Sequence, residues 1–138
     1  MKDTTSRGDL AEWQVAAALI QTGRRLLHPL SSASRYDLAI DNEDGSIMRI
    51  QCKTGVFRNG RIEFRVYSMS GHRGTRGRTY QGQIDAFGVY CPQTRESYLI
   101  PMSDLAGHSG AACLRVSPAR NGQVKRTRLA RDYLIGVS

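Results

Sequence analysis

Four polar residues have types and spacing that suit chemistry on a phosphate ester. Gln51 and Lys53 lie two positions apart in an apolar segment, so in a β-strand their side chains would share one face. Asp37 opens the preceding apolar segment, and Glu12 lies in a segment of helical periodicity. Mg²⁺ is usually held by one or two carboxylates, with waters and substrate phosphate completing its shell. These residue types therefore favour metal-assisted hydrolysis of a phosphodiester.

In that chemistry each residue would have a definite role. Asp37 and Glu12 would bind the metal ion, and Gln51 would lend it an amide oxygen. Lys53 would orient the attacking water and offset the negative charge that develops on the phosphate. A structural interpretation is also available, since an aspartate at a strand start is commonly a turn or cap residue and a Gln-x-Lys pair is commonly a solvated face. Spacing alone leaves both interpretations open.

The segment Ser6–Thr22 must position Glu12, and its pattern predicts a helix. Ser6 is a suitable N-cap, and Gly23 is a suitable C-cap. The apolar residues at helical spacing, which we expect to face the core, are Leu10, Trp13, Ala17 and Ile20. Glu12 lies off this stripe and would lean over the edge of the neighbouring sheet.

A β-hairpin is predicted to position the other three polar residues. Its strands are Tyr36–Ile40 and Ile47–Lys53, and Asp41–Gly45 forms a turn rich in Asn, Asp and Gly. Pairing through this turn would bring Asp37 close to Lys53. A carboxylate, an amide oxygen and an ammonium group would then meet at one edge of the sheet.

The rest of the chain predicts further strands and one irregular segment. The expected strands are Arg25–Pro29, Arg61–Ser68 after the Arg58–Gly60 turn, Ile84–Cys91, Ser97–Pro101, and one more strand or turn at Cys113–Val116. The Gly- and Arg-rich stretch Met69–Gly82 has no periodicity and is expected to be a mobile loop. We expect one α/β domain over residues 1–138, built on a mixed sheet, with a basic C-terminal extension at about 111–138.

The charge balance favours a nucleic-acid partner. Lys and Arg number 20 against 12 for Asp and Glu, which gives a formal net charge of +8. Most of the excess is arginine, whose planar guanidinium suits phosphate. An anionic membrane or an acidic protein is a poorer alternative, and a surface charged only for solubility stays open.

Several other classes of protein are disfavoured. The three cysteines, Cys52, Cys91 and Cys113, are too few and too widely spaced for a disulfide framework or a zinc site. The three histidines show no metal-ligand spacing either. No apolar run approaches the roughly 20 residues needed to cross a bilayer, and the N-terminus has no signal-peptide core. We therefore expect a cytoplasmic protein with reduced thiols and no membrane partner.

The motifs together resemble the PD-(D/E)XK nuclease superfamily. The resemblance is carried by Glu12, then Arg35-Tyr36-Asp37, then Gln51-Cys52-Lys53, in that order. More narrowly, five segments are similar to cyanobacterial group I intron homing endonucleases and to the nearby archaeal-type Holliday junction resolvases, namely Gly8–Glu12, Ser34–Leu38, Arg49–Gly55, Tyr80–Asp85 and Val89–Pro92. The resemblance covers about Gly8–Asp104. It implies a restriction-endonuclease-like α/β core, in which an N-terminal helix is followed by a mixed central β-sheet with flanking helices.

The resemblance also implies a metal-dependent site. The catalytic and metal-binding residues that it implies are Glu12, Asp37, Gln51, Lys53 and, through its backbone carbonyl, Cys52. The implied cofactor is Mg²⁺, with Mn²⁺ as a possible substitute. Gln51 departs from the superfamily, where Glu or Asp is usual, although glutamine is the norm within this branch. Tyr36 replaces the usual proline, whose role is backbone shape.

A second group of residues is a candidate for contacting nucleic acid. Arginines on a glycine-rich scaffold can follow a phosphate backbone, and glutamine amides can hydrogen-bond DNA or the site. The members are Arg35, Arg58, Arg65, Arg73, Arg76, Arg78, Gln81 and Gln83. A solvated loop is the alternative for the arginines of the glycine-rich stretch. The basic C-terminal tail offers a similar choice between a DNA arm and a solvated terminus.

The leading hypothesis is a Mg²⁺-dependent DNA endonuclease that acts on a specific duplex site or on a branched junction. One chain carries one site, so cutting both strands needs a homodimer or a tetramer. The alternative is a catalytically inactive nucleic-acid-binding module on the same fold, which the neutral Gln51 favours. Retention of Glu12, Asp37 and Lys53 together argues against that alternative.

Overall fold

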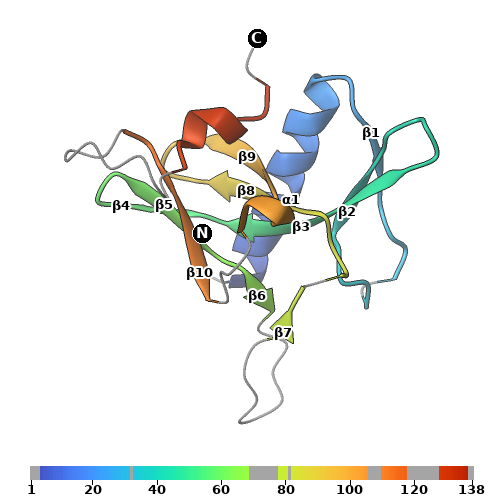
Figure 1. The fold of residues 1–138 in the computed structure, drawn as a ribbon, viewed down its shortest axis with the longest axis horizontal. Coiled ribbons are helices and arrows are strands. Elements are labelled where there is room, and N and C mark those ends of the chain that lie inside the picture. Colours follow the sequence, from blue (N-terminus) through green and yellow to red (C-terminus); the bar gives the residue numbers. More distant parts are fainter. Residues whose placement is uncertain are drawn as a thin grey trace.

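A computed structural model describes residues 4–31, 33–68, 78–80, 82–105, 110–117 and 128–136 of the chain. The first described element is helix α1 (Thr4–Gln21), which confirms the predicted helix. Ser6 lies inside this helix, so its prediction as the N-cap was wrong. Gly23, just beyond the helix, has a φ of +85°, a left-handed conformation that glycine adopts without strain. In Figure 1 this helix lies across the central sheet.

The central sheet has five strands in the order β1-β2-β3-β8-β9. Their bounds are β1 (Arg25–Leu27), β2 (Leu38–Asp41), β3 (Ile47–Thr54), β8 (Ala86–Cys91) and β9 (Glu96–Pro101). The β2–β3 hairpin pairs Leu38 with Ile50, so the predicted antiparallel pairing is confirmed. Strands β3 and β8 are parallel and the other neighbours are antiparallel, which makes the sheet mixed.

A second sheet has the order β10-β5-β4. Its strands are β4 (Val56–Arg58), β5 (Arg61–Arg65) and β10 (Ala111–Arg115). The sequence did not predict β4. Asn59 and Gly60, between β4 and β5, have φ values of 54° and 75°, and two consecutive left-handed residues make the tight turn that suits a twisted hairpin.

Short elements complete the described fold. They are the two-stranded pair β6 (Tyr67–Ser68) and β7 (Arg78–Thr79), and the 3₁₀ helices η1 (Met102–Leu105) and η2 (Ala130–Tyr133). In Figure 1 the pair β6 and β7 projects below the two larger sheets. The loop predicted at Met69–Gly82 falls largely on residues 69–77 and 81, which lie outside the described residues. No helix of the described segments is long and apolar enough to cross a membrane.

Two buried clusters lie on the two faces of the central sheet. On the α1 side, Val15 and Leu19 pack with Ile50. On the other side, Phe87 packs with Ile62 and other residues of the second sheet. Strand β8 is buried on both faces, as a central strand with a parallel neighbour should be. Helix α1, followed by a mixed central sheet, is the α/β arrangement that the resemblance implied.

The predicted core stripe of the helix was wrong. Trp13 is 75% exposed and Ile20 is 59% exposed, whereas Ala11, Val15 and Leu19 are buried. Close contact between α1 and β8 explains the difference, because a Cβ atom on Gly88 would lie only 2.7 Å from Val15 Cγ1. A surface this close to the helix favours small and β-branched residues, so the larger indole faces solvent instead.

Candidate active site

Asp37 lies against strand β3 immediately before β2 begins. Its backbone N–H donates to the Ile50 carbonyl at 2.8 Å, which starts the hairpin pairing one residue early. Its carboxylate Oδ2 accepts the backbone N–H of Cys52 at 2.9 Å. Asp37 is thereby fixed beside the Gln51–Lys53 stretch of β3, where the predicted hairpin would put it.

The surroundings of Asp37 disfavour its charge. Burial is the main cause that raises the pKa of the Asp37 carboxyl above its ordinary value of 3.8, and the nearby Glu12 carboxylate acts in the same direction. The Cys52 N–H group and the positive charges of Lys53 and His28 act against the rise without cancelling it. A buried carboxylate beside another carboxylate is an arrangement that a divalent cation would relieve.

Glu12 reaches this site from α1 and has a partner that the sequence did not reveal. Its Oε1 lies 3.0 Å from His28 Nε2, just beyond β1. The Glu12 side chain is about one third exposed, so it faces both the solvent and the Asp37 region. Among the described residues, no group of three or more His, Cys, Asp or Glu side chains is arranged so that it could hold a metal ion by itself.

The oxygen donors of the candidate site fit a hard cation. Asp37, Glu12 and the Gln51 amide would offer oxygen ligands, and Mg²⁺ is commonly bound by one or two carboxylates together with waters. The nearby Cys52 side chain is buried in the cluster beneath α1. Burial chiefly raises the pKa of this thiol, with help from Asp37 and Glu12, so it stays a neutral thiol and adds no soft ligand.

Lys53 lies on the opposite face of β3 from Ile50 and Cys52. Because side chains alternate along a strand, it shares its face with the half-buried Gln51. Lys53 Nζ donates to the Tyr67 carbonyl at 3.0 Å and to the Tyr80 hydroxyl at 3.1 Å. The same nitrogen lies 4.9 Å from the centre of the Tyr80 ring.

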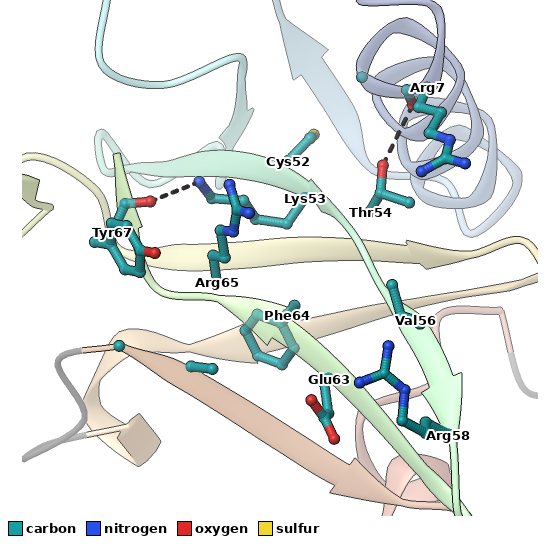
Figure 2. A pocket seen from close by; sticks show the side chains of 13 residues that line it. Arg7, Cys52, Lys53, Thr54, Val56, Arg58, Glu63, Phe64, Arg65 and Tyr67 are labelled. Carbon is teal, nitrogen blue, oxygen red and sulfur yellow. Dashed lines mark hydrogen bonds between the residues drawn. The ribbon is translucent and has the colours of Figure 1, made fainter. Parts of the chain in front are cut away.

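A groove of about 750 Å³ runs beside Lys53 (Figure 2). Its charged lining is mostly basic, with Arg7 from α1, Arg58 from β4 and Arg65 from β5. Glu63 is the acidic residue in the lining. Arg7 is held near the groove where its backbone carbonyl accepts the Thr54 hydroxyl at 3.3 Å. Lys53 on β3 and Arg65 on β5 both line this groove (Figure 2).

The structure separates the predicted nucleic-acid contacts into three sets. Arg58 and Arg65 line the groove. Arg35 instead donates a hydrogen bond to Gln83 and lies 4.4 Å from the centre of the Tyr80 ring. Arg73, Arg76 and Gln81 are outside the described residues, and so is the side chain of Arg78 on β7.

Three residues beside the site were not proposed from sequence. His28 carried no recognisable signal, because its contact with Glu12 depends on the path of the chain beyond β1. Arg7 and Tyr80 did adjoin quoted motifs, Arg7 next to Gly8 and Tyr80 at the start of the Tyr80–Asp85 segment. Their proximity to Lys53 depends on long-range packing that the motifs do not specify.

Comparison with known proteins identifies the family of this chain. The sequence pattern of the PD-(D/E)XK endonuclease family matches residues 2–135, so the chain belongs to that family. The match extends further than the Gly8–Asp104 region in which the sequence resemblance was recognised. The fold is similar to that of a bacterial homing endonuclease, I-Ssp6803I, with a TM-score of 0.75 and 20% sequence identity over 96% of this chain and 88% of that chain. No curated protein sequence matches this chain.

Proposed function

We propose that this PD-(D/E)XK endonuclease is a Mg²⁺-dependent enzyme that hydrolyses phosphodiester bonds of DNA. The observation that carries the proposal is the position of Asp37, whose carboxylate is hydrogen-bonded to β3 at Cys52 and interacts electrostatically with both Glu12 and Lys53. Lys53 in turn lines a groove with three arginines, so the carboxylate that suits a cation and the basic groups that suit a polyanion are connected through β3. Family membership supports the nuclease class.

The chain's own residues would divide the work. Asp37 and Glu12 would hold the cation through carboxylate oxygens, and Gln51 and the Cys52 carbonyl would offer further oxygen ligands. When bound, the cation supplies Lewis acidity toward the phosphate and its attacking water. Lys53 orients that water and offsets the negative charge that builds up on the phosphate oxygens. Mn²⁺ also prefers oxygen ligands and is expected to replace Mg²⁺.

The groove accounts for substrate binding in this proposal. Arg58 and Arg65, with Arg7, contact successive phosphates on one side of the scissile bond. Arg35 and Gln83 act as one hydrogen-bonded unit on the side of Tyr80. Both duplex DNA and branched junctions present phosphates at suitable spacing, and two or four copies of the chain would supply the sites needed to cut more than one strand.

Cleavage of two substrates tests the proposal. A fixed four-way junction and a supercoiled plasmid library are incubated with Mg²⁺, with Mn²⁺ and with EDTA, using wild-type protein, Lys53→Ala and Asp37→Ala. We expect cutting that depends on the metal ion and is lost in both variants, while Lys53→Ala still binds DNA. Full activity of Lys53→Ala would exclude the role of that lysine. Light scattering at the working concentration tests the oligomer, and a strictly monomeric species would contradict concerted cleavage of both strands.

A second candidate function is a DNA-binding module without catalysis. Gln51 favours it, because a neutral amide binds a cation more weakly than the carboxylate that is usual at this position of the superfamily. Gln51→Glu discriminates between the two functions. An active wild type establishes the enzyme, whereas salt-sensitive DNA binding with cleavage appearing only in Gln51→Glu would establish the binding module.

A further inference from the structure

Tyr80 contacts the Lys53 ammonium in two ways. Its hydroxyl accepts a hydrogen bond from Nζ at 3.1 Å, and its ring centre lies 4.9 Å from the same nitrogen. The Tyr67 carbonyl accepts a second hydrogen bond at 3.0 Å. An ammonium group has three donors, and within the described part of the chain these are the two acceptors of Lys53. One N–H is therefore left to point at a substrate.

The position of Tyr80 is itself fixed by packing and by the turn that follows it. Its side chain is buried, with the ring edge-on to Phe87 at 5.7 Å between centres. The backbone N–H groups of Gln83 and Ile84 both donate to the Tyr80 carbonyl, at 2.9 and 3.3 Å. The Arg35 guanidinium lies 4.4 Å from the ring centre.

The end of this turn is joined directly to β3, the strand that carries Lys53. The Asp85 backbone N–H donates to the Arg49 carbonyl at 2.8 Å, and the Arg49 backbone N–H donates to Asp85 Oδ2 at 2.8 Å. The Arg49 side chain also donates to Asp85 and to the Gly82 carbonyl. Tyr80 is thus held relative to β3 by a network that does not involve Lys53.

We propose that Tyr80 is a positioning residue for Lys53, holding the ammonium group at a fixed place so that its remaining N–H faces the reacting phosphate or water. A lysine side chain has four rotatable bonds and loses much of its freedom when it is immobilised. The hydroxyl and the ring of Tyr80 impose that order before the substrate binds. The inference rests on the proposed nuclease function, and its consequence is a Tyr80 effect on the chemical step and not on DNA binding.

Single-turnover cleavage separates these two effects. Tyr80→Phe keeps the ring and the core packing and removes one hydrogen bond to a charged donor, so we expect the cleavage rate to fall about 10-fold. Tyr80→Leu removes the ring as well, and we expect a fall of about 100-fold. The dissociation constant for DNA should change by less than about two-fold in Tyr80→Phe, which keeps both the groove arginines and the ring that Arg35 contacts.

Tyr98→Phe is the matched control. Tyr98 is also buried, and its hydroxyl lies 3.3 Å from Thr94 Oγ1 instead of a group in the site. Removing this hydroxyl tests whether loss of any buried tyrosine hydroxyl slows the enzyme. We expect Tyr98→Phe to cleave at the wild-type rate, and thermal unfolding of all the variants confirms that each is folded.

A spectroscopic measurement tests the contact without relying on activity. The chain has only three lysines, Lys2, Lys53 and Lys125, so selective ¹³Cε labelling gives three NMR signals, and Lys53→Met identifies one of them. The Lys53 Hε resonances should differ from those of Lys2 and Lys125 because of the ring current of Tyr80. This difference should persist in Tyr80→Phe and disappear in Tyr80→Leu.

The outcomes distinguish failure of the positioning role from failure of the proposed function. If the wild type cuts no substrate, the nuclease function fails, and a Lys53 signal unaffected by Tyr80→Leu additionally overturns the contact. If the wild type cuts DNA but both Tyr80 variants cut at its rate, the positioning role is overturned while the function stands. Slower cleavage with unchanged DNA affinity and the expected spectral change supports it.

Discussion

Two aspartates accept a backbone N–H group from strand β3 in nearly the same geometry. Asp37 accepts from Cys52 at 2.9 Å, and Asp85 accepts from Arg49 at 2.8 Å. Both residues come just before a strand that pairs with β3, and each helps to fix that strand. Hydrogen bonding to the backbone therefore does not distinguish them.

Their electrostatic surroundings do distinguish them. The Asp85 side chain is 41% exposed, and its hydrogen bonds with the Arg49 guanidinium are the main cause that holds its pKa below 3.8. The pKa of Asp37 is raised, first by burial, and the nearest acidic neighbour adds to the rise. Asp85 has a positively charged partner, Arg49, within the chain. The positive charges near Asp37 do not cancel the effect of its burial, so a bound cation would stabilise its charged form. The comparison shows that two aspartates can share one hydrogen-bond motif and differ in burial and in charge compensation.

Removing the charge of Asp37 should have the largest effect, and this effect should be on the cleavage rate. Asp37→Asn keeps the shape and an acceptor for the Cys52 N–H but removes the charge, so we expect the cleavage rate to fall about 1,000-fold. The free energy of unfolding should not fall, because a neutral amide avoids the cost of burying a charge. Cleavage kinetics and urea unfolding measure the two effects.

Asp85→Asn is the matched control for that substitution. It should retain at least about one tenth of the wild-type cleavage rate, because Asp85 acts on the fold and not on the cation. If both variants lost cleavage equally, the assignment of separate roles to the two aspartates would be wrong.

The next effect in size is stabilisation by the metal ion. At a free Mg²⁺ concentration about 100 times its dissociation constant, binding to the folded state alone adds about 2.7 kcal/mol. Thermal unfolding with Mg²⁺ and with EDTA should show this shift for wild type and for Asp85→Asn. The same shift in Asp37→Asn would show that the ion binds elsewhere.

A smaller effect is expected on stability when the Arg49–Asp85 pair is broken. Asp85→Asn should lower the free energy of unfolding by about 1 kcal/mol, a value kept modest because solvent screens this partly exposed pair. Glu43→Gln is the control, since its ion pair with Arg25 is more exposed and should contribute less. Equal losses in the urea unfolding of the two variants would mean that the Arg49–Asp85 pair contributes no more than the exposed Arg25–Glu43 pair.

The smallest effect is the pH dependence of that same pair. The pKa of Asp85 is lower in the folded protein than its ordinary value of 3.8, so the folded state binds fewer protons in this range. The stability that Asp85 contributes is present above about pH 4 and decreases as the pH falls below 3.8 through the folded-state pKa. The difference in melting temperature between wild type and Asp85→Asn should therefore shrink in acid, and a difference that grew would contradict the ion pair.

Local patterns predicted the elements that position Asp37. The turn composition at Asp41–Gly45 and the apolar segments on either side specified the hairpin, and the hairpin register follows from its turn. The end of the helix was also predictable locally, because Gly23 marks it, whereas its start lies before the predicted N-cap Ser6. These features depend on residues near one another in the chain, which is why sequence was sufficient.

Features set by long-range packing were not predictable in the same way. Which side of α1 faces the sheet depends on Gly88, more than sixty residues beyond the helix. The prediction that Trp13 and Ile20 face the core was therefore wrong. The contacts of Lys53 with Tyr67 and Tyr80 likewise depend on how the second sheet and the 80–85 turn pack. The order of the motifs was enough to predict candidate catalytic residues, whereas the groups that contact them could be identified only from the fold.

The outward-facing Trp13 has a practical consequence for these measurements. It is the only tryptophan of the chain, and it is 75% exposed in the folded protein. An indole already surrounded by water emits at nearly the same wavelength before and after the chain unfolds. Intrinsic fluorescence is therefore a poor reporter of unfolding for this protein, and circular dichroism is the better signal. The same indole is a sensitive reporter of any molecule that comes to lie over α1.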